Sequence, residues 1–198
     1  IKGFDLLMLG TMRHARNHIT SFFAGSASVL DLGCGGGRTA GSIADSGVKD
    51  VWGIDPSPYH LKHAAAKFPA VKFIQGVAEN NIFSDKRFDG VAVCFLFHEL
   101  PPKVTKQTLL ECKRILKDGG RLMICEPSPT QWYNSYWRLF KEFGLKGIYF
   151  KLLANSVHEP FVQLWHATDV RKLLTECGFR LLSDNDNMPF RFLACVKQ

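Results

Sequence analysis

The chain has 198 residues, 46% of them hydrophobic, and a formal net charge of +7 at pH 7, which suits one domain with a substantial core. It contains no run of about 20 apolar residues, which excludes a membrane-spanning helix. Its six cysteines form no C-x-x-C pair, which argues against a metal or disulfide framework and favours the reducing cytoplasm. The basic charge admits nucleic acid or an anionic membrane surface as a partner, but Lys and Arg are scattered along the chain, which favours an ordinary basic enzyme and disfavours nucleic acid.

Strands and helices alternate from residue 28 onward. Short apolar runs predict strands at 29–32, 51–54, 71–75, 90–95 and 121–125, and the segments between them predict helices at 38–46, 58–67 and 105–116. Ser57 is the expected N-cap of the second helix, with Pro58 in its first turn. Because helices that alternate with strands connect parallel neighbours, this pattern predicts a parallel sheet with helices on both faces.

The C-terminal part of the chain has a different pattern. Residues 166–177 predict a helix with Thr168 as its N-cap and Gly178 after its last turn. Residues 179–183 and 190–196 then predict two strands joined by a turn, which we expect to pair antiparallel.

Two segments lie outside this alternation. Residues 1–27 precede the first strand and predict a helical arm, and residues 127–165 form an insert between the fifth strand and the last helix. The insert carries aromatic residues at helical spacing, namely Trp132, Tyr133, Tyr136, Trp137, Phe140 and Phe143.

The sequence V-L-D-L-G-C-G-G-G at 29–37 carries the strongest functional signal. It predicts a strand, a tight turn and a helix N-terminus, where a nucleotide-like ligand lies against bare backbone, because glycines allow positive φ and close approach. Residues 35–40, with an acid at Asp55, also satisfy the dinucleotide fingerprint G-x-G-x-x-A. Asp31 favours a different ligand, because a carboxylate there suits a cationic ammonium and not a pyrophosphate.

Three features together resemble the class I S-adenosylmethionine (SAM)-dependent methyltransferases, whose first motif reads D-x-G-x-G-x-G. They are D-L-G-C-G-G-G beginning at Asp31, F-H-E-L at 97–100 after the fourth strand, and R-I-L-K-D-G-G-R-L at 114–122 before the fifth. The resemblance is strong over 28–126 and is greatest to the small-molecule, quinone-biosynthesis-like group (methyltransferase type 11). It implies an α/β fold with a Rossmann-like parallel sheet flanked by helices and finished by an antiparallel C-terminal hairpin. It also implies a single methyltransferase domain over 1–198, with SAM as cofactor.

The resemblance implies roles for individual residues of this chain. Asp31 would receive the cofactor ammonium, Asp55 would accept both ribose hydroxyls or else cap the following helix, and the Ala78 backbone N–H would bond the adenine ring. The remaining implied cofactor residues are Gly33, Cys34, Gly35, Gly37, Pro56, Glu79 and Phe95. Val77 departs from the family's G-D-A-E sequence, because its side chain accepts no hydrogen bond from the adenine amino group; that contact is lost or moves to Glu79.

The reacting end is expected just after the fourth strand. Methyl transfer from a sulfonium requires alignment and exclusion of water, and a general base is optional. His98 would take a proton from a phenol or enol, or would only wall the pocket. Glu99 would alternatively join His98 and Glu126 around a divalent metal, but these residues lack a metal-ligand spacing. We therefore assign catalytic roles to His98 and Glu99 and assign no metal site.

The aromatic insert is expected to cover the acceptor, with Trp132, Tyr136 and Trp137 as substrate residues; the alternative is a helical hairpin that only adds core. Its lysines would rest against an anionic membrane surface as a peripheral contact. The predicted function is methyl transfer to a small, apolar or aromatic acceptor, with a quinone or quinone precursor as the candidate. Two alternatives stay open: a SAM-using enzyme with non-methylating, metal-assisted chemistry on a quinone, and an RNA-modifying or RNA-binding protein.

Overall fold

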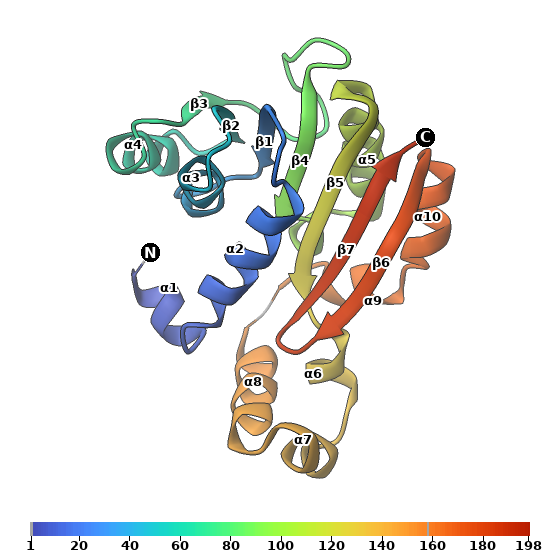
Figure 1. Cartoon of the computed structure of the whole chain (residues 1–198). Coiled ribbons are helices and arrows are strands. Elements are labelled where there is room, and N and C mark those ends of the chain that lie inside the picture. The colour runs from blue at the N-terminus through green and yellow to red at the C-terminus, as the bar shows by residue number, and fades with distance from the viewer. Residues whose placement is uncertain (1, 158) are drawn as a thin grey trace.

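A seven-stranded sheet runs through the molecule in the computed structural model, which describes residues 2–157 and 159–198 (Figure 1). The strands are β1 (Ser28–Leu32), β2 (Asp50–Asp55), β3 (Lys72–Gln75), β4 (Phe88–Cys94), β5 (Leu116–Pro127), β6 (Phe179–Asn187) and β7 (Phe190–Lys197), in the order β3-β2-β1-β4-β5-β7-β6. The first five strands are parallel, and β7 pairs antiparallel with both β5 and β6. The predicted fold class is confirmed.

Helices precede, connect and extend this sheet. They are α1 (Lys2–Leu7), α2 (Thr11–Phe22), α3 (Arg38–Asp45), α4 (Pro58–Lys67), the 3-10 turn η1 (Phe97–Glu99), α5 (Pro102–Ile115), α6 (Pro129–Tyr133), α7 (Tyr136–Phe143), α8 (Leu145–Ser156), α9 (Val162–Ala167) and α10 (Val170–Glu176). The expected cap of α4 is confirmed, because the Ser57 hydroxyl accepts the His60 N–H at 3.3 Å.

Alternation along the buried strands divides the core into two layers. In β4, Val91 and Val93 face a cluster that includes Leu109 of α5 and Leu174 of α10. Ala92, between them, faces the opposite cluster with α2 and α3. A strand with both faces covered is apolar throughout, as the sequence of β4 is.

The structure corrects the expected helix at 166–177. It consists of two helices, α9 and α10, with Thr168 in extended conformation between them. The Thr168 hydroxyl donates to the Leu164 carbonyl at 2.7 Å and closes α9, whereas the Asp169 carboxylate accepts the Lys172 N–H at 3.0 Å and caps α10. Thr168 is therefore not the N-cap, because the adjacent carboxylate takes that position.

Two strand boundaries also differ from expectation. Strand β5 begins at Leu116, which pairs with Phe88, and the register then shifts so that Arg121 pairs with Gly90. Residues 117–120, which lie between the expected helix and the expected strand, thus form a bulge at the start of β5. Strand β6 continues to Asn187, so the hairpin turn is shorter than the sequence suggested.

The insert helices α6, α7 and α8 lie beyond the carboxyl ends of β4 and β5, on the same side of the molecule as α1 (Figure 1). The Tyr149 hydroxyl of α8 donates to the Leu7 carbonyl at the end of α1 at 2.5 Å, which connects the insert to the N-terminal arm. None of the helices in the described part of the chain is long and apolar enough to cross a membrane.

Candidate functional site

The turn after β1 borders a cavity of about 240 Å³, here called the glycine-loop cavity. Gly33, Cys34, Gly35 and Gly36 form its loop side, and residues of α1, α2, α3 and the end of β4 form the rest. Gly35 has φ +48°, and a Cβ placed there would meet nothing within 4 Å. The loop backbone is therefore open toward the cavity, which a ligand requires for close approach.

Gly37 closes the turn in a different way. It is the N-cap of α3 with φ +72°, and a Cβ there would lie 2.7 Å from the Phe73 ring. Glycine is needed at this position both for the left-handed conformation and for packing against β3.

Asp55, at the end of β2, holds the glycine loop in place through hydrogen bonds to the backbone. Its Oδ2 accepts the Gly35 N–H at 2.8 Å and its Oδ1 accepts the Ser57 N–H at 2.9 Å. Each carboxylate oxygen retains a second lone pair for a ligand hydroxyl. The helix-capping and ribose-binding interpretations of Asp55 are thus geometrically compatible.

Asp31 lies under the loop and is buried, with 1% exposure. Its carboxylate accepts the Ala40 N–H at 2.9 Å. Burial raises the pKa of Asp31 to about 7; the Ala40 hydrogen bond opposes the shift, and the charge of Asp55 adds to it. A buried carboxylate held mainly by one backbone N–H is costly, so a ligand ammonium nearby would stabilise its ionised form. This fits the amino group of SAM.

Two arginines at this cavity were missed as site residues. Arg16 of α2 and Arg38 of α3 both line it, and both pair with the carboxylate of Asp5 in α1. The Arg38 Nε is buried without a hydrogen-bond partner among the described residues. Two guanidiniums suit the carboxylate of an amino-acid ligand. The arm sequence M-R-H-A-R contains Arg16 but does not indicate which of its basic residues faces the site, and Arg38 follows the glycine turn directly.

The other expected cofactor residues follow the strands at the same edge of the sheet. Pro56 follows β2, and its carbonyl accepts the Gln75 side-chain amide at 3.1 Å. Ala78 and Glu79 lie after β3 beside Val77, which is 41% exposed and pairs with Asn80 in an isolated bridge. Burial, with Asp31 and Asp55 nearby, raises the pKa of the Cys34 thiol.

A second cavity of about 370 Å³, here called the aromatic cavity, lies between the sheet and the insert. Trp132 and Phe150 line it from the insert, Met8 from the end of the arm's first helix, and Phe95 and His98 from the end of β4. Phe95 borders both cavities and has φ +60°, a conformation that costs a non-glycine residue about 1–3 kcal/mol. Strained backbone of this kind is common at functional sites.

His98 has a fixed orientation in the aromatic cavity. Its Nδ1 lies 2.5 Å from Oε2 of Glu126, whose Oε1 accepts the Leu96 and Phe97 N–H groups at 2.9 and 2.8 Å. Burial alone would lower the pKa of His98, but the hydrogen bond and charge of Glu126, with the charges of Glu159 and Glu99, raise it above its usual value. Glu126 is completely buried, and its geometry leaves the Nε2 of His98 for the cavity.

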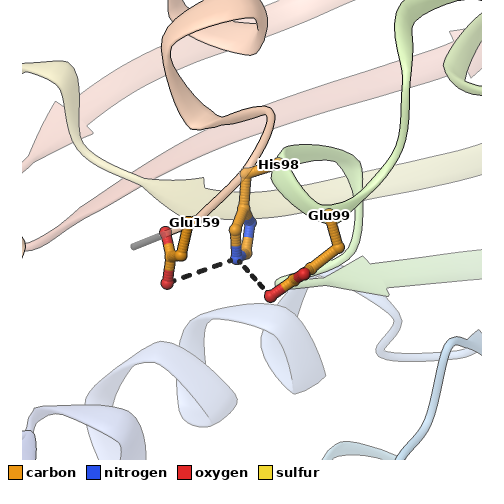
Figure 2. Close-up of side chains that lie close together, drawn as sticks. All are labelled: His98, Glu99 and Glu159. Carbon is orange, nitrogen blue, oxygen red and sulfur yellow. Dashed lines mark ion pairs between the residues drawn. The ribbon is translucent and has the colours of Figure 1, made fainter. Parts of the chain in front are cut away.

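Figure 2 shows Glu99 and Glu159 on either side of the His98 ring. An oxygen of each lies 3.7 Å from Nε2. Burial raises the pKa of Glu159, which His98 opposes, and its Oε2 is buried without a hydrogen-bond partner in the described part of the chain. Sequence reasoning grouped Glu126 with His98 and Glu99 and missed Glu159. Glu126 instead holds the opposite nitrogen of the imidazole.

The expected substrate residues separate into two groups. Trp132 lines the aromatic cavity, and its ring lies edge-on to His166 at 5.1 Å. Tyr136 and Trp137 do not line it. Trp137 is 74% exposed on the outer side of α7, whereas Tyr136 lies against α8, where its hydroxyl accepts the Asn155 side-chain amide at 3.2 Å and its ring lies under the Lys151 ammonium. The reason is that α7 packs on α8 through Leu139, which is buried, and through Tyr136, so Trp137 is left facing outward.

Comparison with known proteins agrees with these features. Residues 29–120 match the family model described as "Methyltransferase domain". The chain is 35% identical over 155 residues to an uncharacterized methyltransferase of Synechocystis sp. (strain PCC 6803), covering 78% of this chain and 67% of that protein. It is 31% identical over 159 residues to the demethylmenaquinone methyltransferase of Beutenbergia cavernae, covering 77% of this chain and 65% of that one. The chain therefore spans about two thirds of the length of these relatives.

Among solved structures, the chain is similar to the 1,6-didemethyltoxoflavin-N1-methyltransferase of Burkholderia thailandensis, with bound 1,6-didemethyltoxoflavin and S-adenosylhomocysteine. The TM-score is 0.67 at 18% identity, covering 95% of this chain and 78% of that one. At this identity the likeness concerns the fold.

Proposed function

Because the chain belongs to the class I SAM-dependent methyltransferase family and uses SAM as its cofactor, we propose that it methylates a small, apolar or aromatic acceptor held in the aromatic cavity. The observation that carries this proposal is the position of Phe95, which borders both the glycine-loop cavity and the aromatic cavity. A cofactor in the first cavity and an acceptor in the second would meet at this residue, as methyl transfer between bound molecules requires.

The glycine-loop cavity would hold the cofactor. Asp31 would neutralise the ammonium, Asp55 would accept the ribose hydroxyls, and the open backbone at Gly35 would lie against the ligand. When bound, SAM supplies a methyl group on an activated sulfonium. The chain then has to align the acceptor and exclude water, which the insert and the arm would do as covers over one methyltransferase domain.

The lining of the aromatic cavity supports an apolar acceptor. It is formed mainly by carbon, with Trp132 and Phe150 on one side, and its polar groups gather around His98. An aromatic ring would pack between the side chains while its oxygen faced His98 and Glu99. Relatives at 30–31% sequence identity include demethylmenaquinone methyltransferases. Their names support a quinone or quinone precursor as the acceptor and a place in quinone biosynthesis.

The outer side of α7 supports peripheral binding to a membrane from the cytoplasm. Trp137 and Phe140 are exposed, with ring centroids 6.3 Å apart, and Leu145 is exposed at the start of α8. Lys141 and Lys146 are exposed in the same segment. Exposed aromatic side chains with lysines suit an anionic lipid surface. The protein would take up a quinone acceptor from that membrane.

Calorimetry with SAM and S-adenosylhomocysteine tests the cofactor, and transfer of labelled methyl to demethylated quinones and phenols tests the acceptor. We expect micromolar binding and a methylated product, with transfer lost in Trp132→Ala while S-adenosylhomocysteine still binds. No binding of either cofactor form at high micromolar concentration would refute the proposal. Steep salt-dependent RNA binding without small-molecule methylation would favour the RNA alternative.

A further inference from the structure

The polar end of the aromatic cavity combines one imidazole nitrogen with two carboxylates from separate segments. His98 and Glu99 belong to η1, and Glu159 comes from the segment between α8 and α9. Their ligand atoms all lie within 4.8 Å of one another, and all three residues line the cavity. We propose that His98, Glu99 and Glu159 bind a divalent cation that takes the oxygen of the acceptor. This inference rests on the proposed function, whose acceptor cavity it describes further.

The spacing of the three groups suits an ion and not a direct bond between them. The Nε2 of His98 lies 3.7 Å from an oxygen of each glutamate, beyond hydrogen-bond distance (Figure 2). A metal about 2.1 Å from each ligand requires the ligand atoms to lie about 3.0–3.4 Å apart. The two distances from Nε2 therefore need to contract by only a few tenths of an ångström. The ligand oxygens of Glu99 and Glu159, which lie within 4.8 Å of each other, have to approach as well, and the half-exposed Glu99 side chain is free to move.

Glu126 provides the support that a histidine ligand needs. Metal-binding histidines usually donate the other ring N–H to a carboxylate, which fixes the tautomer and directs the free nitrogen at the ion. Here Nδ1 contacts Oε2 of Glu126 at 2.5 Å, and backbone N–H groups hold the second oxygen of Glu126. His98 is itself 2% exposed and its ring is locked in place.

Charge in this region also favours a cation. Three carboxylates, those of Glu99, Glu126 and Glu159, surround a single imidazole. Even with His98 protonated, two negative charges would remain uncompensated within the group. Oε1 of Glu159 faces Nε2 of His98, and Oε2 of the same carboxylate is buried without a hydrogen-bond partner among the described residues, so a cation bound to this carboxylate would offset the cost of its burial. One nitrogen and two carboxylate oxygens suit Mn²⁺, Fe²⁺ or Zn²⁺.

Three protein ligands leave positions open for the acceptor. The matching class is an aromatic or enolic compound with oxygens on neighbouring carbons, which would bind the ion through both. The ion would lower the pKa of the acceptor hydroxyl, so its proton leaves to solvent water. The acceptor oxygen then forms the bond to the methyl carbon while the carbon–sulfur bond breaks, and the sulfonium becomes a thioether.

Mn²⁺ titration of the full chain, followed by the electron paramagnetic resonance signal of the free ion, tests the site directly. We expect one saturable Mn²⁺ per chain, displaced by Zn²⁺. Glu159→Gln and Glu99→Gln should each weaken Mn²⁺ binding at least tenfold. Glu176 of α10 forms an exposed ion pair with Lys106 of α5, so Glu176→Gln should bind Mn²⁺ as the wild type does. Equal Mn²⁺ affinity in the wild type and both variants, or no saturable binding at millimolar Mn²⁺, would overturn the inference.

Methyl transfer with and without a chelator separates this inference from the proposed function. If a neighbouring-dioxygen acceptor is methylated only when Mn²⁺ is present, both stand. If it is methylated equally in chelator, the metal site is refuted and the methyltransferase stands. If S-adenosylhomocysteine does not bind at all, the proposed function fails, while the Mn²⁺ titration still decides the site.

Discussion

Asp31→Asn should make stability less dependent on pH and should weaken cofactor binding. Asp31 has a pKa of about 7 in the folded chain, against an ordinary value of 3.8 for an unfolded one. Between these values the folded state holds a proton that the unfolded state has released, so the free energy of unfolding decreases as pH rises. At about 1.4 kcal/mol per pH unit, the decrease from pH 5.5 to pH 8.5 amounts to about 2 kcal/mol. The amide of the variant would not titrate and would contribute no such slope.

Urea unfolding followed by circular dichroism at pH 5.5, 7.0 and 8.5 measures this difference. The free energy of unfolding of the wild type minus that of the variant should decrease by about 2 kcal/mol over the range, whatever constant offset the amide introduces. Calorimetry at pH 8 should show SAM affinity reduced about 10- to 100-fold in the variant, from loss of a charged contact. A pH-independent difference in stability would refute the assigned ionisation, and unchanged SAM affinity would refute the ammonium contact.

Three further outcomes follow from the geometry. Gly37→Ala should lower the free energy of unfolding in urea by about 2–4 kcal/mol, because the new Cβ brings both φ strain and a clash with Phe73. Gly10→Ala has the same φ of 72° and nothing within 4 Å, so its free energy of unfolding should fall by the φ strain alone. Equal decreases in the two variants would contradict the packing argument. Asp5→Asn should raise SAM affinity several-fold in calorimetry, because it releases two arginines from a competing carboxylate; weaker binding would show that Asp5 positions them. Trp137→Ala should reduce sedimentation with anionic vesicles while leaving SAM affinity unchanged, and equal sedimentation would place membrane contact elsewhere.

The conformation of the glycine loop was predictable because its determinants are local. The strand, turn and helix from β1 to α3 are specified within one short segment, and glycine at residue 37 serves both the turn and the packing. Ser57 with Pro58 likewise specifies the start of α4 without reference to the rest of the chain. Parallel pairing then brings Asp55 to the Gly35 N–H, because neighbouring parallel strands end at one edge of the sheet.

The aromatic insert shows why the lining of the aromatic cavity was less predictable. Helical spacing of aromatic residues indicates that one face of α7 packs, but not what it packs against. In the structure Leu139 fills that role against α8, and Trp137 is left 74% exposed. Trp132 reaches the aromatic cavity because α6 begins directly after β5, which the position of the fifth strand does indicate.

The aromatic cavity is assembled from parts of the chain that share no local pattern. Met8 comes from the arm, Phe150 from the insert, Pro189 from the hairpin turn and His98 from the end of β4. Glu159 reaches His98 only because the chain returns from α8 to α9 past the carboxyl end of that strand. A carboxylate in an otherwise ordinary loop carries no sequence signal. Glu126 lies next to a predicted strand and was therefore the residue considered beside His98 and Glu99 in the metal alternative, whereas in the structure Glu159 has the better geometry for that place. The glycine loop is specified in one local segment, whereas the aromatic cavity is built from several distant ones, so a chain of this fold can retain the first while changing the second. The acceptor proposed for this protein therefore has to be inferred from the geometry around His98.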